Sequence, residues 1–113
     1  MKPIILAQTE DTPKVIFDSE KEIFEISGRS MPEDTAKFYH PLIEWILEYN
    51  KNPKEVSNFV FHFEFMSTST TKQMMKIFYA IEQLANIKKV NVSSVCARII
   101  GFIGSIINVC FYN

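Results

Sequence analysis

The sequence predicts a single α/β domain in which helices pack on a mixed sheet. Two segments carry apolar residues at the three- and four-residue spacing of a helix, and segments with strand-like alternation flank them. A hairpin pattern precedes both, so the expected order is strand, hairpin, helix, strand, helix, strand. Connections through helices favour parallel pairing of the later strands. We therefore expect about four to five strands and two or three helices in one domain over residues 1–113.

The N-terminal part predicts short strands and a hairpin. Residues 3–8 are mostly apolar and form a first strand, and the polar segment 9–13 ends in Thr-Pro, a turn signal. Residues 15–18 indicate a second strand and residues 22–28 a third, with a turn at 19–21 between them. The second and third strands therefore close the hairpin.

The first helix is expected over residues 34–49. Pro32 and the acids after it suit a helix start, and residues 50–53 end the pattern. Pro41 lies inside it and removes one helix hydrogen bond, so we expect a bend or an irregular turn there. The apolar stripe, which we interpret as core rather than as a ligand site, consists of Phe38, Leu42, Trp45, Ile46 and Tyr49.

The central stretch joins a strand to the second helix through consecutive hydroxyl residues. Residues 59–66 alternate like a strand, and residues 67–71 read Ser-Thr-Ser-Thr-Thr before Lys72. The helix that follows has apolar positions at Met74, Ile77, Phe78, Ile81, Leu84 and Ala85. A polar loop comes next, and residues 90–92 begin another strand.

This strand-to-helix junction has two interpretations. The first N–H groups of a helix lack partners, and Ser or Thr commonly caps them. The same donors and the positive end of the helix dipole also hold anions, so a hydroxyl there can carry a phosphate with Lys72 as its partner. Since such clusters are usually caps and an exposed lysine is usually solvated, the pattern alone leaves both interpretations open.

Composition argues against several classes of function. A net charge of −1 and the lack of a basic patch argue against nucleic-acid binding. Cys96 and Cys110 have neither metal nor redox spacing, and His40 and His62 share no ligand pattern with them, so we expect free thiols, structural histidines and no metal or cofactor. We find no nucleophile with a base and no glycine-rich phosphate loop, which predicts that the protein is not an enzyme. No signal peptide is apparent, and we expect a cytoplasmic protein.

The C-terminal tail is apolar. The last acidic residue is Glu82, and between Val95 and Phe111 the only charge is Arg98. This run is near the lower length limit for crossing a bilayer, although a buried terminal helix or strand explains it equally well. An interaction scaffold that the tail anchors to a membrane therefore stays as the alternative function.

Three groups of residues together resemble the SiaC family of bacterial regulatory phosphoproteins. They are Gly-Arg-Ser-Met-Pro-Glu at 28–33, then Phe38, Tyr39, Pro41 and Trp45, then Phe-Met-Ser-Thr-Ser at 65–69 with Lys72. The resemblance covers residues 4–92. The combination at these distances is specific, whereas any one piece would be weak.

The resemblance implies a STAS-like fold, as in anti-sigma-factor antagonists, and a regulator that is not an enzyme. It implies a partner Ser/Thr kinase, a PP2C-type phosphatase, and a diguanylate cyclase that the unphosphorylated protein activates, which links the chain to cyclic-di-GMP and biofilm formation. The phosphorylated threonine of the family motif falls on Thr68, whose surroundings are Ser67, Ser69, Thr70 and Lys72. Apart from Thr68, the hydroxyl residues are expected to be caps and turn formers.

The resemblance also suggests how a phosphate would act. It adds about −1.5 to −2 charges, which at a helix N-terminus need not unfold the domain but would break a close-packed partner contact. Arg29, Ser30, Met31 and Pro32 are expected to join that partner surface, and a tight structural loop is the other interpretation.

Two departures from the family pattern stand out. The motif asparagine is Ser67 here, and a hydroxyl offers one donor where an amide offers two. Residues 93–113 lack the aromatics, acidic stretch and final helix of the family. We therefore set this segment apart as an atypical tail, either a frameshifted reading of the family C-terminus or a divergent one.

Overall fold

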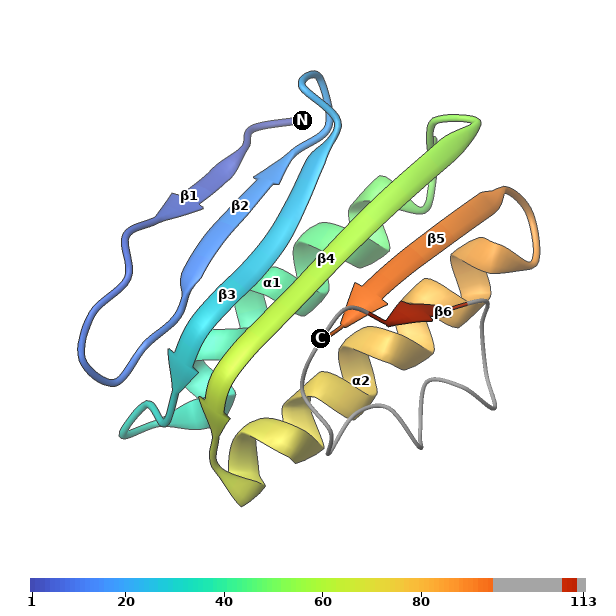
Figure 1. Cartoon of the computed structure of the whole chain (residues 1–113). Helices are drawn as coiled ribbons and strands as arrows, with labels where there is room; N and C mark the ends of the chain where they lie inside the picture. The colour runs from blue at the N-terminus through green and yellow to red at the C-terminus, as the bar shows by residue number, and fades with distance from the viewer. Residues whose placement is uncertain (95–108, 112–113) are drawn as a thin grey trace.

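The computed structural model describes residues 1–94 and 109–111, in which six strands form one sheet. Their order is β1-β2-β3-β4-β5-β6, so each strand lies beside its neighbours in sequence. Both described helices cover the same face of this sheet (Figure 1). The expected fold class is confirmed, with one strand more than the upper number expected.

The N-terminal strands form antiparallel pairs, and the hairpin predicted from the second and third strands is confirmed. β1 (Ile4–Leu6) pairs with β2 (Lys14–Asp18), and β2 pairs with β3 (Ile23–Ser30). In the turn between β2 and β3, the carboxylate of Asp18 accepts hydrogen bonds from two backbone N–H groups at 3.1 and 3.2 Å. Such local bonds are the reason Asp favours turns.

β3, β4 and β5 are parallel because a helix connects each of them to the next. α1 (Thr35–Tyr49) leads from β3 to β4 (Val56–Met66), and α2 (Thr68–Ala85) leads from β4 to β5 (Lys89–Ser94). β6 (Val109–Phe111) pairs in parallel with β5. A short part of the apolar tail is therefore a strand of the sheet.

The expectations for the rest of the tail lie outside the described residues. The expectations of a membrane span and of a frameshift concern residues 95–108 and 112–113, which are not described. The expected free thiol of Cys96 lies in the same range. In the part of the chain that is described, no helix is long and apolar enough to cross a membrane.

α1 begins where the sequence predicts. The Asp34 carboxylate caps it by accepting a hydrogen bond from the backbone N–H of Lys37 at 3.1 Å. The helix runs through the exposed Pro41 to Tyr49 in α-helical conformation, so no irregular turn forms at this proline.

The core lies between the helices and one face of the sheet. Phe59, Phe61 and Phe63 of β4 are buried toward the helices, while the residues between them are exposed. Trp45 packs against Phe17 with 5.2 Å between ring centroids, and it is stacked on Tyr49 at 5.6 Å. The aromatic stripe of α1 is therefore core, as the sequence predicts, although Phe38 is only half-buried.

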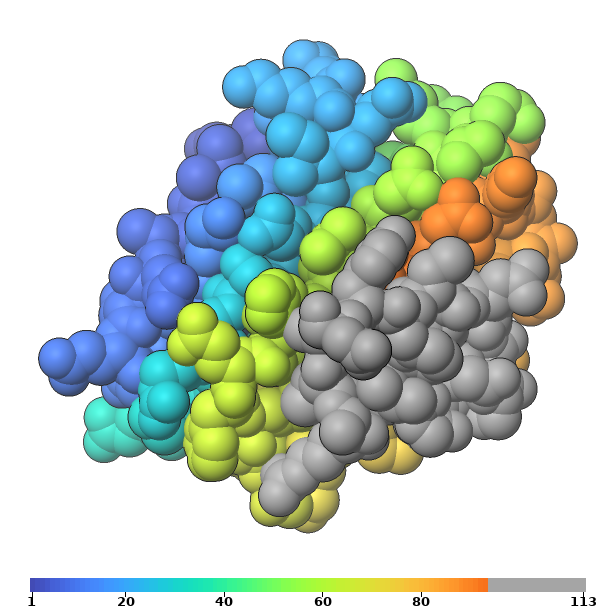
Figure 2. Space-filling view, viewed as in Figure 1, coloured from blue at the N-terminus to red at the C-terminus, as the bar shows by residue number. Residues whose placement is uncertain are grey.

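The opposite face of the sheet is partly polar, and Figure 2 shows β2, β3 and β4 reaching the surface there. Lys14 forms an ion pair with Glu25 at 3.1 Å, and the Ser27 hydroxyl donates to the same carboxylate at 2.7 Å. Burial raises the pKa of Glu25, but the hydrogen bonds from Ser27 and Lys14 outweigh burial and leave that pKa below its ordinary value.

The expectation that a loop begins at Gly28 is wrong. β3 continues to Ser30 because β4 offers a parallel partner as far as Met66, which pairs with Ser30. The register shifts between Gly28 and Arg29, and Gly28 adopts a φ of +114°. This region of backbone space favours glycine, so Gly28 permits the irregularity without ending the strand.

Candidate functional site

The site suggested by the sequence is the N-terminus of α2. Ser67 takes the cap position in extended conformation, and its hydroxyl accepts a hydrogen bond from the backbone N–H of Thr70 at 3.2 Å. Its carbonyl accepts from the N–H of Thr71 at 3.0 Å. The capping role expected of Ser67 is therefore confirmed.

Thr68 is the first residue of α2, and its side chain is exposed. Among the described residues, no protein group accepts a hydrogen bond from the backbone N–H of Thr68 or Ser69. These are the donors that the start of a helix leaves unsatisfied. The side chain of Thr68 thus lies at a helix end that suits an anion, where solvent and a modifying enzyme can reach it.

Beneath Thr68, hydroxyl groups form a chain of hydrogen bonds into the core. The Ser67 hydroxyl donates to Thr70 Oγ1 at 2.9 Å, and Thr70 Oγ1 lies 3.0 Å from Ser30 Oγ. Ser30 Oγ lies 2.6 Å from the hydroxyl of Tyr39. Ser30 and Thr70 are both fully buried, and Tyr39 is a buried residue of α1. The chain therefore connects β3, α1 and the cap of α2.

The directions of these bonds follow from the number of protons. Thr70 has one hydroxyl proton, which it donates to the carbonyl of Ser30 at 3.1 Å. Ser30 Oγ must then donate to Thr70, and the Tyr39 hydroxyl must donate to Ser30. Tyr39 can do so only while protonated. Burial raises the pKa of Tyr39 well above its ordinary value, although the hydrogen bond with Ser30 opposes this.

A second branch of the network joins α2 to the start of α1. Ser69 Oγ lies 3.2 Å from Ser67 Oγ and 2.9 Å from Thr35 Oγ1. In addition, the backbone N–H of Ser67 donates to the carbonyl of Ser30 at 2.9 Å. The two helix N-termini are thereby held against the end of β3.

The predicted partner residues divide into exposed and buried positions. Arg29 is exposed, with its guanidinium 5.4 Å from the centre of the Phe65 ring, and Met31 is 36% exposed. Pro32 is half-buried. The expectation that all four residues join a partner surface is wrong for Ser30. This residue is fully buried, and its hydroxyl bonds to Tyr39 and Thr70. Ser30 therefore does not face solvent.

The sequence interpretation missed Thr35 and Tyr39 as members of the site. Both lie on the buried row of α1, together with Leu42, Ile46 and Tyr49. This row has spacings of four, three, four and three, the regular pattern of a buried helix face. The predicted apolar stripe contains Phe38 in place of Tyr39 and therefore departs from this pattern, although the sequence itself shows the regular spacing.

The remaining predicted residues lie at the surface. Lys72 is exposed one turn beyond Thr68 and has no ion pair among the described residues. His40 and His62 are also exposed, so neither packs in the core. In the described ranges, no group of three or more His, Cys, Asp or Glu residues could hold a metal ion.

Solved structures similar to this chain share its fold. Apo-SiaC from Pseudomonas aeruginosa matches with a TM-score of 0.86 and 16% identity, over 100% of both chains. A second structure of SiaC from this organism matches with a TM-score of 0.87 and 18% identity, over 100% of this chain and 98% of that one.

A third match comes from the diguanylate cyclase SiaD in complex with its activator SiaC from Pseudomonas aeruginosa. It has a TM-score of 0.82 and 16% identity, and it covers 96% of this chain and 97% of the other. Comparison with curated proteins gave no match. The model of the SiaC family of regulatory phosphoproteins matches residues 6–96, which is most of the sequence. The chain belongs to the SiaC family of regulatory phosphoproteins.

Proposed function

We propose that this chain is a cytoplasmic regulator, not itself an enzyme, that binds and activates a diguanylate cyclase and is switched by phosphorylation of Thr68. It would thereby control cyclic-di-GMP signalling and biofilm formation. A Ser/Thr kinase would add the phosphate, and a PP2C-type phosphatase would remove it. No cofactor is required for this role.

The placement of Thr68 is the observation that carries the proposal. Its side chain is exposed at the first position of α2, beside backbone N–H groups that have no acceptor in the described chain. The neighbouring Thr70 is fully buried within the hydroxyl chain. A kinase therefore meets Thr68 at the surface, whereas Thr70 would have to leave the core before it could react.

Membership of the SiaC family supports a role as a regulatory phosphoprotein. The choice of a diguanylate cyclase as partner is supported by the complex of SiaD with its activator SiaC, whose fold this chain shares. The Arg29–Pro32 segment would contribute Arg29 and Met31 to the contact, because these two side chains reach the surface.

A phosphate on Thr68 would change charge more than shape. It adds about −1.5 to −2 charges at neutral pH, and the N-terminus of α2 stabilises them through its dipole. The cap on Ser67 and the buried hydroxyl chain do not involve the Thr68 side chain, so both survive the modification. The switch would thus act on the partner contact while the domain stays folded.

The test compares binding of the cyclase from the same genome to wild type, Thr68→Ala and Thr68→Glu. We expect Thr68→Ala to bind like wild type and Thr68→Glu to bind at least about tenfold more weakly, a loss of about 1.4 kcal/mol. Asn58→Glu adds the same charge on an exposed position of β4 and serves as the control, with binding unchanged. Equal binding by wild type and Thr68→Glu would overturn the proposed switch.

A further inference from the structure

The hydroxyl of Thr70 lies two residues after Thr68 and uses all of its hydrogen-bonding capacity. It accepts from Ser67 Oγ at 2.9 Å and from Ser30 Oγ at 3.0 Å, and it donates to the Ser30 carbonyl at 3.1 Å. A hydroxyl has one proton and two acceptor positions, so these three bonds fill it. Thr70 is also fully buried, and solvent therefore does not compete for this group.

Ser30 holds the chain on both sides of Thr68. Its carbonyl accepts from the backbone N–H of Ser67 at 2.9 Å as well as from the hydroxyl of Thr70. Ser67 comes directly before Thr68, and Thr70 comes two residues after it. Figure 1 shows that α2 begins where β3 and β4 end side by side. The first turn of α2 is therefore attached to a strand end at two points, with Thr68 between them.

The side chain of Thr68 has no attachment of its own. It is exposed, and no group in the part of the chain that the structure describes forms a hydrogen bond with it. Because a β-branched side chain is restricted at its first torsion angle, the position of its hydroxyl follows the backbone closely. The bonds of Ser67 and Thr70 therefore determine where the Thr68 hydroxyl lies.

This position matters for the reaction that Thr68 would undergo. In the proposed transfer, the Thr68 oxygen forms a bond to the γ-phosphorus of a nucleoside triphosphate while the bond from that phosphorus to the bridging oxygen breaks. A base of the kinase takes the hydroxyl proton, and the nucleoside diphosphate leaves. The attacking and leaving oxygens lie roughly in line, and a misplacement of about 1 Å costs about a hundredfold in rate.

We propose that Thr70 is a positioning residue for this transfer. Its buried hydroxyl would fix the first turn of α2 so that the kinase meets the Thr68 hydroxyl in one orientation. Thr70 would act through Ser67 and Ser30, because its own side chain does not reach the surface. This inference rests on the proposed function and adds the residue that prepares its site.

The chain offers a matched control for a purely structural role. Ser57 Oγ lies 2.7 Å from the hydroxyl of Tyr49, much as Ser30 Oγ lies 2.6 Å from the hydroxyl of Tyr39. Ser57 is also fully buried, but it is the second residue of β4, whereas α2 follows the other end of that strand. Ser57→Ala therefore removes a buried hydroxyl and its hydrogen bond without changing the start of α2.

The first test measures steady-state phosphorylation of the full chain by the Ser/Thr kinase of the same genome. Thr70→Val keeps the branched shape and removes the hydroxyl, whereas Thr70→Ser keeps the hydroxyl. We expect Thr70→Val to lower kcat about tenfold or more and to change KM less than about threefold, because the surface that docks on the kinase is unchanged. Thr70→Ser and Ser57→Ala should keep kcat within about threefold of wild type. Circular dichroism at the assay temperature verifies that each variant is folded.

The second test asks whether Ser30 and Thr70 act through one contact. Ser30→Ala removes one of the two donors to Thr70 and leaves the Ser30 carbonyl in place. It should lower kcat about threefold in the wild-type chain and have no further effect in a chain that carries Thr70→Val. Should Thr70→Val not fold, Ser30→Ala against Ser57→Ala makes the same comparison, since each variant leaves one buried tyrosine without its serine partner.

The outcomes separate this inference from the proposed function. If the kinase modifies Thr68 of the wild type and Thr70→Val keeps the wild-type kcat, the positioning role is wrong while the proposed function stands. An equal loss of kcat in Thr70→Ser and Thr70→Val, or in Ser57→Ala and Ser30→Ala, overturns the positioning role in the same way. If the kinase does not modify Thr68 of the wild type, both fail.

Discussion

At the scale of single residues, the hydroxyl of Tyr39 connects the core to the N-terminus of α2. It donates to Ser30, which donates to Thr70, and Thr70 also accepts from the cap residue Ser67. Each of these buried groups has at least one hydrogen-bond partner, which avoids the free-energy cost of a buried polar group without a partner. The surface that carries Thr68 is therefore supported by groups that do not themselves face solvent.

Tyr39 should make the free energy of unfolding fall at alkaline pH. Burial raises its pKa in the folded state, whereas an unfolded tyrosine ionises near its ordinary value of about 10. Above about pH 10 the unfolded chain therefore releases a proton that the folded chain keeps, and stability is lost as pH rises toward the folded-state pKa. Urea unfolding at pH 9 to 11.5 measures this loss.

Tyr39→Phe removes this ionisation and supplies the matched comparison. The variant should lose about 1 kcal/mol at neutral pH, since Ser30 loses a donor. Above about pH 10 its stability should fall less steeply than that of wild type. Parallel slopes for the two proteins would contradict the raised pKa of Tyr39 in the folded state.

At the scale of elements, α2 depends on Ser67 for its start. The hydroxyl accepts from the backbone of Thr70 and donates to its side chain, so one residue serves both the helix and the buried network. Ser67→Ala should destabilise the domain by about 1 kcal/mol or more. Ser67→Asn should stay close to wild type, because Asn caps as well as Ser. Both values come from urea unfolding, and equal losses in the two variants would show that the cap does not determine stability here.

The elements themselves were largely predictable from periodicity. α1 begins within one residue of the expected position because Asp34 is a capping residue and the apolar spacing begins directly after it. The strand that contains Phe59, Phe61 and Phe63 was clear because its large side chains alternate. The end of β3 was not predictable from the sequence. Gly28 and Pro32 signal a loop, whereas the parallel partner β4 extends the strand to Ser30. Pairing across the sheet overrode the local signal.

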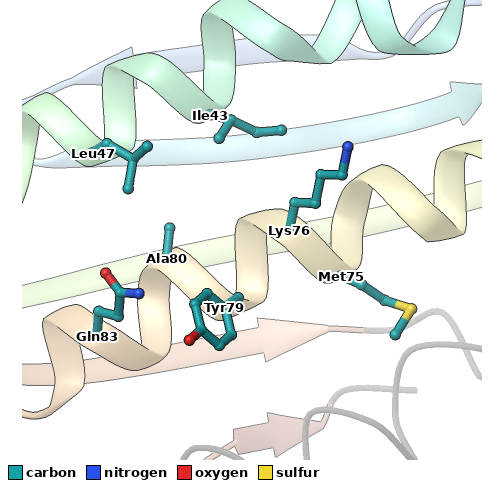
Figure 3. A pocket seen from close by; sticks show the side chains of 7 residues that line it. All are labelled: Ile43, Leu47, Met75, Lys76, Tyr79, Ala80 and Gln83. Carbon is teal, nitrogen blue, oxygen red and sulfur yellow. The ribbon is translucent and has the colours of Figure 1, made fainter.

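The parts of the site differ in how far the sequence could predict them. Ser67 as a cap and Thr68 at the surface follow from local rules on helix termini. The hydrogen bond between Ser30 and Thr70 joins residues 40 positions apart, and no local pattern indicates it. The same applies to the apolar groove of about 500 Å³ between α1 and α2 (Figure 3), because the apolar residues of the two helices form it only after both have packed on the sheet.

At the scale of the whole molecule, the parallel topology places the site. β3 and β4 run in the same direction, and their final residues Ser30 and Met66 are paired in register. The N-termini of α1 and α2 therefore follow these strand ends at the same edge of the sheet, as they do in other parallel α/β arrangements. This edge forms only when the whole sheet is folded. We therefore expect the site and the fold to be lost together on unfolding.

Trp45 can report on that cooperativity. It is only 7% exposed, it packs on Phe17 of β2, and its indole N–H donates to the carbonyl of Lys2 at 2.9 Å. We expect urea unfolding followed by Trp45 fluorescence to coincide with unfolding followed by far-ultraviolet circular dichroism, as for a two-state domain. A fluorescence transition at lower urea would instead show that the N-terminal segment detaches before the rest unfolds.

The most direct test of the regulatory role is phosphorylation by the Ser/Thr kinase of the same genome, read by intact-mass spectrometry and site mapping. We predict one added phosphate, located on Thr68, on a protein that keeps its wild-type circular dichroism spectrum. Thr68→Ala should remain unmodified under the same conditions. A phosphate on another residue of the folded chain, or an equal mass increase in Thr68→Ala, would contradict the assignment of α2's first residue as the switch.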